Sequence, residues 1–132
     1  MTEEAALINS FVVKSKRQRL TELLATSKRR RQATTTLAHF SDFDARWVIP
    51  IPNDQHNPAA VERDLRSRGA GDTCHVISEA SELDGKRLPL RSALEQVIGC
   101  GMGTVLSCVP GKLAYYEGEG PSDRCILEKR AI

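Results

Sequence analysis

The chain has 132 residues, of which 40% are hydrophobic and 27% are charged, as in an ordinary globular domain. No apolar run approaches the ~18 residues of a membrane span, and the acidic start lacks the basic stretch that opens a secretory signal, so we expect a cytoplasmic protein that does not enter a membrane. The formal net charge is +2, yet eight of the 19 Lys and Arg residues lie between positions 14 and 31, with Glu22 as the only acid. Eight cations less one acid give this stretch +7, so the remainder of the chain sums to −5.

Residues 1–45 are predicted to form a basic helical segment ahead of the core. Apolar residues such as Leu20 and Leu24 recur at helical spacing, with cations on the other side. Ser27 is expected to cap a second helix that directs Phe40 inward. The cations in the first turn of this second helix oppose the helix dipole, so an anionic partner would stabilise it.

Residues 46–132 are predicted to form a single α/β core. Runs rich in apolar and aromatic residues predict strands at 47–51, 74–78, 104–109, 112–117 and 124–129. Two helices are expected between them, one from Pro58 to Gly69 and one from Pro89 to Gly99. The order strand–helix–strand–helix–strand favours a βαβαβ unit with a mostly parallel three-strand core. The two last strands would extend it by antiparallel hairpins at one edge.

The concentrated positive charge is the main functional indication, because it attracts polyanions whatever the global balance is. We expect a small binding protein whose N-terminal helices contact nucleic acid, RNA rather than DNA, without sequence specificity, since the basic segment holds no aromatic residue that could read bases. A solvated helix face is the alternative interpretation of the same charges. The candidate phosphate-binding residues are Lys14, Lys16, Arg17, Arg19, Lys28, Arg29, Arg30 and Arg31.

The loop after the second predicted strand gives an alternative hypothesis. It carries Glu79, Glu82 and Asp84, and in a parallel sheet it would lie at the carboxyl ends of the strands, where ligands gather. Carboxylates there could hold Mg²⁺ or Mn²⁺ in a metal-dependent hydrolase or nuclease. The other interpretation is a solvated acidic loop closed by the turn at Asp84–Gly85.

The sequence predicts no catalytic residue, and we expect a non-enzymatic protein. It has neither a nucleophile elbow nor a phosphate-binding glycine loop, and His56 is the one histidine expected at a ligand-facing end. The four cysteines have no metal-binding spacing and are expected to be buried thiols. A third hypothesis is a protein–protein adaptor or homodimer, in which the predicted edge strand 124–129 pairs with a partner.

Residues 75–79, followed by a helix and then by 101–106, resemble the central part of a fold shared by a ribosomal-protein family and the C-terminal domain of release factors. That fold also runs from a strand through a helix to a glycine-containing turn and an apolar strand. The resemblance covers about a quarter of the chain and implies an association with RNA or the ribosome.

Overall fold

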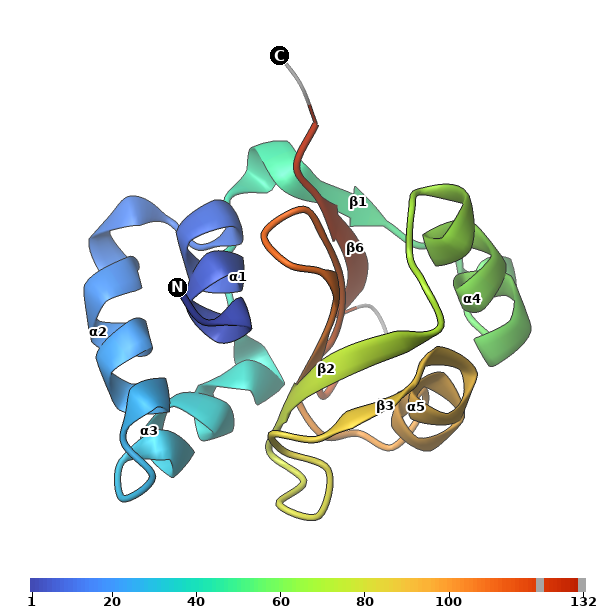
Figure 1. Cartoon of the computed structure of the whole chain (residues 1–132). Helices are drawn as coiled ribbons and strands as arrows, with labels where there is room; N and C mark the ends of the chain where they lie inside the picture. The colour runs from blue at the N-terminus through green and yellow to red at the C-terminus, as the bar shows by residue number, and fades with distance from the viewer. Residues whose placement is uncertain (121–122, 131–132) are drawn as a thin grey trace.

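The computed structural model describes residues 1–120 and 123–130 (Figure 1). Within these residues the chain forms five α-helices, a short 3-10 helix η1 (Thr35–His39) that continues α3, two further 3-10 turns, and one sheet of six strands. The helices are α1 (Glu3–Phe11), α2 (Lys14–Ala25), α3 (Arg30–Thr34), α4 (Pro58–Ser67) and α5 (Leu90–Val97). The strands are β1 (Val48–Pro50), β2 (Thr73–Ser78), β3 (Arg87–Pro89), β4 (Thr104–Val109), β5 (Leu113–Glu117) and β6 (Arg124–Glu128).

Helices cover both faces of the sheet, which gives the molecule three layers. Figure 1 shows α1, α2 and α3 on one side of the sheet and α4 and α5 on the other. The first side holds a hydrophobic cluster in which Phe11 and Leu23 pack against Tyr116 of the sheet. The second side holds a cluster in which Leu65 and Leu94 pack against the opposite face. The helices of residues 1–45 therefore share a core with the strands of residues 46–132.

The sheet is antiparallel throughout, in the order β1-β6-β5-β4-β2-β3. The prediction of an α/β fold with a mostly parallel βαβαβ core is therefore wrong, and the protein is α+β. The five strands and two helices predicted from position 46 onward nevertheless match observed elements to within a few residues, although β3 was not predicted. The strand predicted at 104–109 coincides with β4, and the turn at Pro110–Gly111 has the positive φ of 69° at Gly111 that a type II turn requires.

The error in topology arises from one short strand. Residues predicted as the approach to the second core helix form β3, which pairs back on β2 with Thr73 opposite Pro89. This extra reversal turns the chain before α5, so β4 enters the sheet antiparallel to β2. Along the alternating order β1 and β2 do point the same way, but β6, β5 and β4 lie between them. Neither expected crossover therefore joins two neighbouring parallel strands.

The last strand lies inside the sheet and not at its edge. β6 pairs with β5 on one side and with β1 on the other, where Ile126 stands opposite Ile49. The predicted pairing of residues 124–129 with a partner through a free edge is therefore wrong. A homodimer through another surface stays a prediction.

The N-terminal region contains three α-helices where two were predicted. α1 begins at Glu3, where Thr2 caps it by accepting a hydrogen bond from the amide of Ala5 at 3.0 Å, and two acids in its first turn suit the helix dipole. No helix in the described part of the chain is long and apolar enough to cross a membrane.

Candidate nucleic-acid interface

The eight cations predicted to bind phosphate lie on α2, on α3 and on the connection between these helices. Arg17 is half-buried, and its Nε donates a 2.8 Å hydrogen bond to the backbone carbonyl of Val12. Arg30 is also half-buried. The remaining six side chains are exposed: Lys14, Lys16, Arg19, Lys28, Arg29 and Arg31.

Arg30 differs from the other seven cations because its guanidinium forms ion pairs with two carboxylates. Nη2 lies 2.6 Å from Oε2 of Glu4, and Nε lies 2.6 Å from Oδ2 of Asp84. Burial would raise the pKa of Glu4, but the hydrogen bonds from His75 and Arg30 outweigh it and lower that pKa to about 2. Arg30 thus joins α3 to α1 and to the loop after β2.

Outside residues 14–31 the arginines are mostly paired. Of eight such arginines, six form ion pairs within the described residues: Arg46, Arg66, Arg68, Arg87, Arg91 and Arg124. Among the five arginines and three lysines of 14–31, Arg30 alone has such a partner in the described part of the chain. Glu22, the only acid of α2, accepts a hydrogen bond from Gln18. Seven of the eight cations of this segment therefore have no ion-pair partner among the described residues.

The exposed cations form two groups at opposite ends of α2. Lys14, Lys16 and Arg19 belong to its first turns, whereas the other group follows its last residue, Ala25. At a rise of 1.5 Å per residue, Lys16 and Ala25 are about 13 Å apart along the axis. Two members of the first group, Lys16 and Arg19, border a groove of about 300 Å³ between α2 and the α3–η1 segment, here called the cationic groove. Its lining residues are Lys16, Arg19, Leu20, Leu23, Gln32, Thr36, Phe40 and Asp42.

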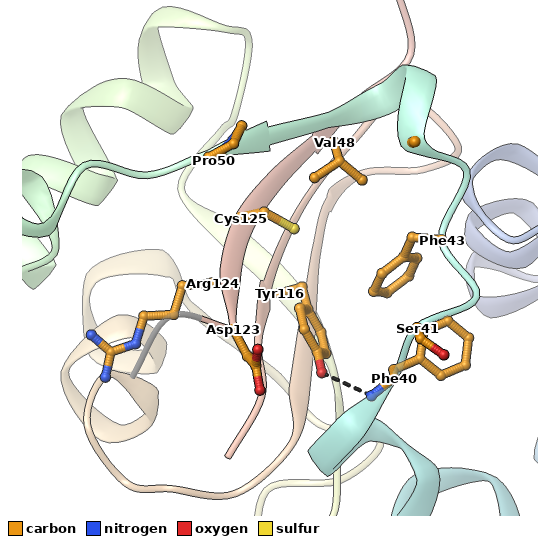
Figure 2. Close-up of a pocket in the computed structure, with 10 residues that line it drawn as sticks. Phe40, Ser41, Phe43, Val48, Pro50, Tyr116, Asp123, Arg124 and Cys125 are labelled. Carbon is orange, nitrogen blue, oxygen red and sulfur yellow. Dashed lines mark hydrogen bonds between the residues drawn. The ribbon is translucent and has the colours of Figure 1, made fainter. Parts of the chain in front are cut away.

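A larger hollow of about 410 Å³, here called the aromatic pocket, opens beside the cationic groove, and Phe40 borders both. In Figure 2, Phe40, Phe43 and Tyr116 gather on one side of it. The Phe43 ring centroid lies 4.6 Å from that of Phe40 and 5.0 Å from that of Tyr116. The pocket is lined by Phe40, Ser41, Phe43, Ala45, Val48, Pro50, Tyr116, Asp123, Arg124 and Cys125.

Tyr115 and Tyr116 are neighbours on β5, so their rings point to opposite faces of the sheet. Both are buried, because helices cover both faces of the sheet. The Tyr116 hydroxyl donates to the carbonyl of Leu37 at 2.5 Å and accepts from the amide of Phe40 at 3.2 Å. Sequence reasoning placed Phe40 in the core and gave Phe43 no role. Their spacing of three residues was the available signal.

The three carboxylates of the alternative metal site do not converge. Asp84 contacts Arg30 and accepts a 3.0 Å hydrogen bond from the amide of Ser78. Glu79 accepts a 2.7 Å hydrogen bond from the amide of Gly103, and Glu82 is exposed. Among the described residues, no group of three His, Cys, Asp or Glu side chains could hold a metal ion. The binding of Mg²⁺ or Mn²⁺ stays a prediction.

A buried chain of polar side chains lies on the other face of the sheet. The Tyr115 hydroxyl donates to Oε1 of Glu117 at 2.7 Å, and Nε2 of His56 lies 2.7 Å from the same hydroxyl. A guanidinium nitrogen of Arg124 contacts Nδ1 of His56. Since Arg124 can only donate, Nδ1 accepts and the imidazole proton lies on Nε2. The chain therefore runs from a cation through two neutral groups to a carboxylate.

Burial shifts the pKa values of His56 and Tyr115 in this chain. Desolvation, with the positive charge of Arg124 as a second cause, lowers the pKa of His56 to about 4. Burial also raises the pKa of Tyr115, and the nearby Glu117 carboxylate adds to that rise. His56 is therefore neutral near neutral pH. His56 does not line the aromatic pocket, but Arg124 does, so this chain meets the pocket at its cationic end.

The cysteines follow the prediction of buried thiols with one exception. Cys74, Cys108 and Cys125 are buried, Cys100 is exposed, and all four are free. Desolvation raises the pKa of Cys125 to about 12 and that of Cys74 to about 11, so these thiols are unreactive.

Comparison of the chain with protein-family models, curated proteins and solved structures finds no match.

Proposed function

We propose that this protein binds nucleic acid through the cations of α2 and of the α2–α3 connection. The observation that carries the proposal is the contrast in pairing. Six of the eight arginines outside residues 14–31 have a carboxylate partner among the described residues, whereas one of the five arginines inside that range, Arg30, has one. Exposed cations without a carboxylate partner, concentrated in one short segment of the chain, favour a polyanionic ligand.

The local energetics of α2 support the same proposal. Its first turn contains Lys14, Lys16 and Arg17 and no acid, and Val13 at its N-cap offers no side-chain hydrogen bond. Cations at this end oppose the helix dipole, and each costs roughly 0.3–1 kcal/mol. A phosphate bound near these residues would offset that cost. Affinity would come from phosphate contacts and would carry little sequence preference.

Salt dependence provides the test. Fluorescence anisotropy of labelled mixed-sequence RNA and DNA, titrated with protein at several salt concentrations, gives the slope of log K against log salt. The combined replacement Lys16→Ala, Arg19→Ala and Arg29→Ala removes three phosphate contacts. For single strands we expect the slope to become shallower by about 2, since each contact contributes roughly 0.7.

The control carries the same change in net charge at another place. Arg63, Lys86 and Lys112 are exposed and have no ion-pair partner among the described residues. Replacing these three with Ala should leave the slope close to that of the wild type. Equal effects of both triple variants would mean that net charge alone governs binding, and the absence of any binding at low salt would refute the proposal.

RNA as the preferred ligand and a cytoplasmic location belong to the same proposal. The free thiols of the four cysteines support a reducing compartment, where disulfides are rare. Competition between RNA and DNA of matched sequence would measure the preference directly.

A further inference from the structure

We propose that the aromatic pocket receives an unpaired nucleobase of a single strand whose phosphates contact Lys16 and Arg19 in the cationic groove. This inference rests on the proposed function and narrows its ligand to single-stranded nucleic acid. A base that has left a duplex stack needs an aromatic surface, and its backbone needs cations within one or two nucleotides.

The aromatic pocket has side chains on which a base can stack. Phe40 and Phe43 are half-buried, so their rings are partly open to solvent, and Tyr116 closes the pocket beside them. Aromatic side chains stack on bases of any sequence because every base has a π-face. The volume of about 410 Å³ falls in the range of roughly 300–1,000 Å³ that is usual for ligand sites.

A second cavity of similar size serves as an internal comparison. It measures about 390 Å³, lies against α4 on the other side of the sheet, and is lined without an aromatic residue. Its lining residues include Arg63 and Asp64, which also form part of the surface of α4. The two cavities therefore have similar volumes. The aromatic pocket differs from the second cavity in its aromatic rings and in the unpaired cations of the adjoining cationic groove.

The aromatic pocket and the cationic groove adjoin each other. Phe40 lines both the aromatic pocket and the cationic groove, so a chain that lies in one can continue into the other. Lys16 and Arg19 supply two positive charges to the groove against the single acid Asp42. This charge fits a phosphodiester backbone. An apolar ligand without a negatively charged group would gain no affinity from these cations.

The polar rim of the pocket suits the edge of a base. Ser41 and Asp123 are exposed, and in Figure 2 the Asp123 carboxylate lies near Tyr116 at one end of the pocket. A carboxylate accepts hydrogen bonds from the ring or exocyclic N–H groups of a base. It also repels phosphate, so the backbone is directed toward Lys16 and Arg19 and the base toward the pocket.

The experiment compares wild type with Phe43→Leu, which keeps an apolar side chain and removes a ring. The ligands are a short single-stranded adenine oligonucleotide carrying one 2-aminopurine and the duplex of the same sequence. We expect the variant to lose affinity for the single strand by roughly tenfold and to bind the duplex like wild type. Quenching of 2-aminopurine fluorescence on binding, which reports stacking, should weaken in the variant.

Phe11→Leu is the matched control, because Phe11 belongs to the same hydrophobic cluster but lines neither the pocket nor the groove. It should bind both ligands like wild type. If Phe43→Leu proves unstable, the measurement on the wild type alone still tests the inference. The inference is overturned if 2-aminopurine fluorescence is not quenched when the wild type binds the single strand. Equal losses for single strand and duplex overturn it as well. Salt-dependent binding without quenching would leave the proposed function standing, whereas no binding at low salt would remove both.

Discussion

The Nε2 atom of His56 lies 2.7 Å from the hydroxyl oxygen of Tyr115, and this contact joins the loop before α4 to the centre of the sheet. The Tyr115 hydroxyl in turn donates a hydrogen bond to one carboxylate oxygen of Glu117. The other carboxylate oxygen of Glu117 accepts a hydrogen bond from the amide of Gly99 at 2.8 Å. Since both rings are buried, every donor in this chain needs its acceptor, and the loss of one member leaves another unsatisfied.

The first prediction concerns acid stability. An unfolded His56 takes up a proton as the pH falls through about 6.5, but in the folded protein it does so only near pH 4, because its pKa is lowered. Between these values the unfolded chain binds more protons, so the free energy of unfolding falls as the pH falls, by at most ~1.4 kcal/mol per pH unit. Denaturant unfolding curves at a series of pH values measure this slope.

The His56→Gln variant isolates the contribution of the imidazole. Its amide can accept from Arg124 and donate to Tyr115 without titrating. We expect a flatter profile than wild type above pH 4.5, where Glu4 does not yet contribute. The pKa of Glu4 is lowered from 4.5 to about 2, so its stabilisation is lost only below that window. Identical slopes in variant and wild type would show that His56 does not control this range.

The second prediction compares two adjacent tyrosines. Tyr115→Phe removes the donor to the buried carboxylate of Glu117, whereas Tyr116→Phe removes a donor to the neutral carbonyl of Leu37. Hydrogen bonds to charged groups contribute roughly 1.5–3 kcal/mol and neutral ones about 1 kcal/mol. Chemical denaturation should therefore find Tyr115→Phe the more destabilising of the two. The reverse order would contradict the ranking of these two hydrogen bonds.

The third prediction uses a glycine at a close approach. A Cβ atom at Gly103 would lie 2.2 Å from the backbone carbonyl carbon of Leu37, which cannot move without shifting η1. Gly103→Ala should lower the free energy of unfolding by about 3 kcal/mol or more. Gly71→Ala is the control, because nothing lies within 4 Å of its Cβ position. The Tm of Gly71→Ala, measured by thermal melting, should equal that of the wild type or lie slightly above it.

The fourth prediction separates structural from ligand-binding cations. Arg30→Ala leaves the carboxylates of Glu4 and Asp84 without their cation and should cost about 2 kcal/mol of stability. It should leave the salt slope of nucleic-acid binding unchanged. The neighbour Arg29 is exposed, so Arg29→Ala should change stability by less than ~0.5 kcal/mol and make the slope shallower by about 0.7. A changed slope in Arg30→Ala would contradict this division.

The local structure of the core was predictable from the sequence, but its topology was not. The strand at β4, the helix that Asn57 caps and the turn at Gly111 all follow from short-range chemistry. β4 and β5 are buried almost throughout, because helices cover both faces, and such continuous burial is typical of parallel sheets. The parallel prediction, however, came from the order strand–helix–strand–helix–strand, which is typical of βαβ crossovers. β3 has three residues, which is too short for an alternation of apolar and polar residues to be recognised in the sequence.

The candidate site was predictable in part. The charge of residues 14–31 is a property of the sequence, and most of its side chains are exposed as a solvated face requires. The pairing of Arg30 with Glu4 and Asp84 joins residues that are 26 and 54 positions apart, which no local pattern reveals. The approach of Phe40 to Tyr116 spans 76 positions and depends on the same tertiary packing.

The two outer strands have a consequence for behaviour at high concentration. β1 and β3 each have three residues, and each ends at a proline, Pro50 and Pro89. A proline offers no amide hydrogen, and a short strand presents few groups to an incoming chain. These two outer strands of the described sheet therefore offer a poor template for the edge-to-edge stacking that starts amyloid fibrils. We expect concentrated solutions of the folded protein to stay free of thioflavin-positive aggregates.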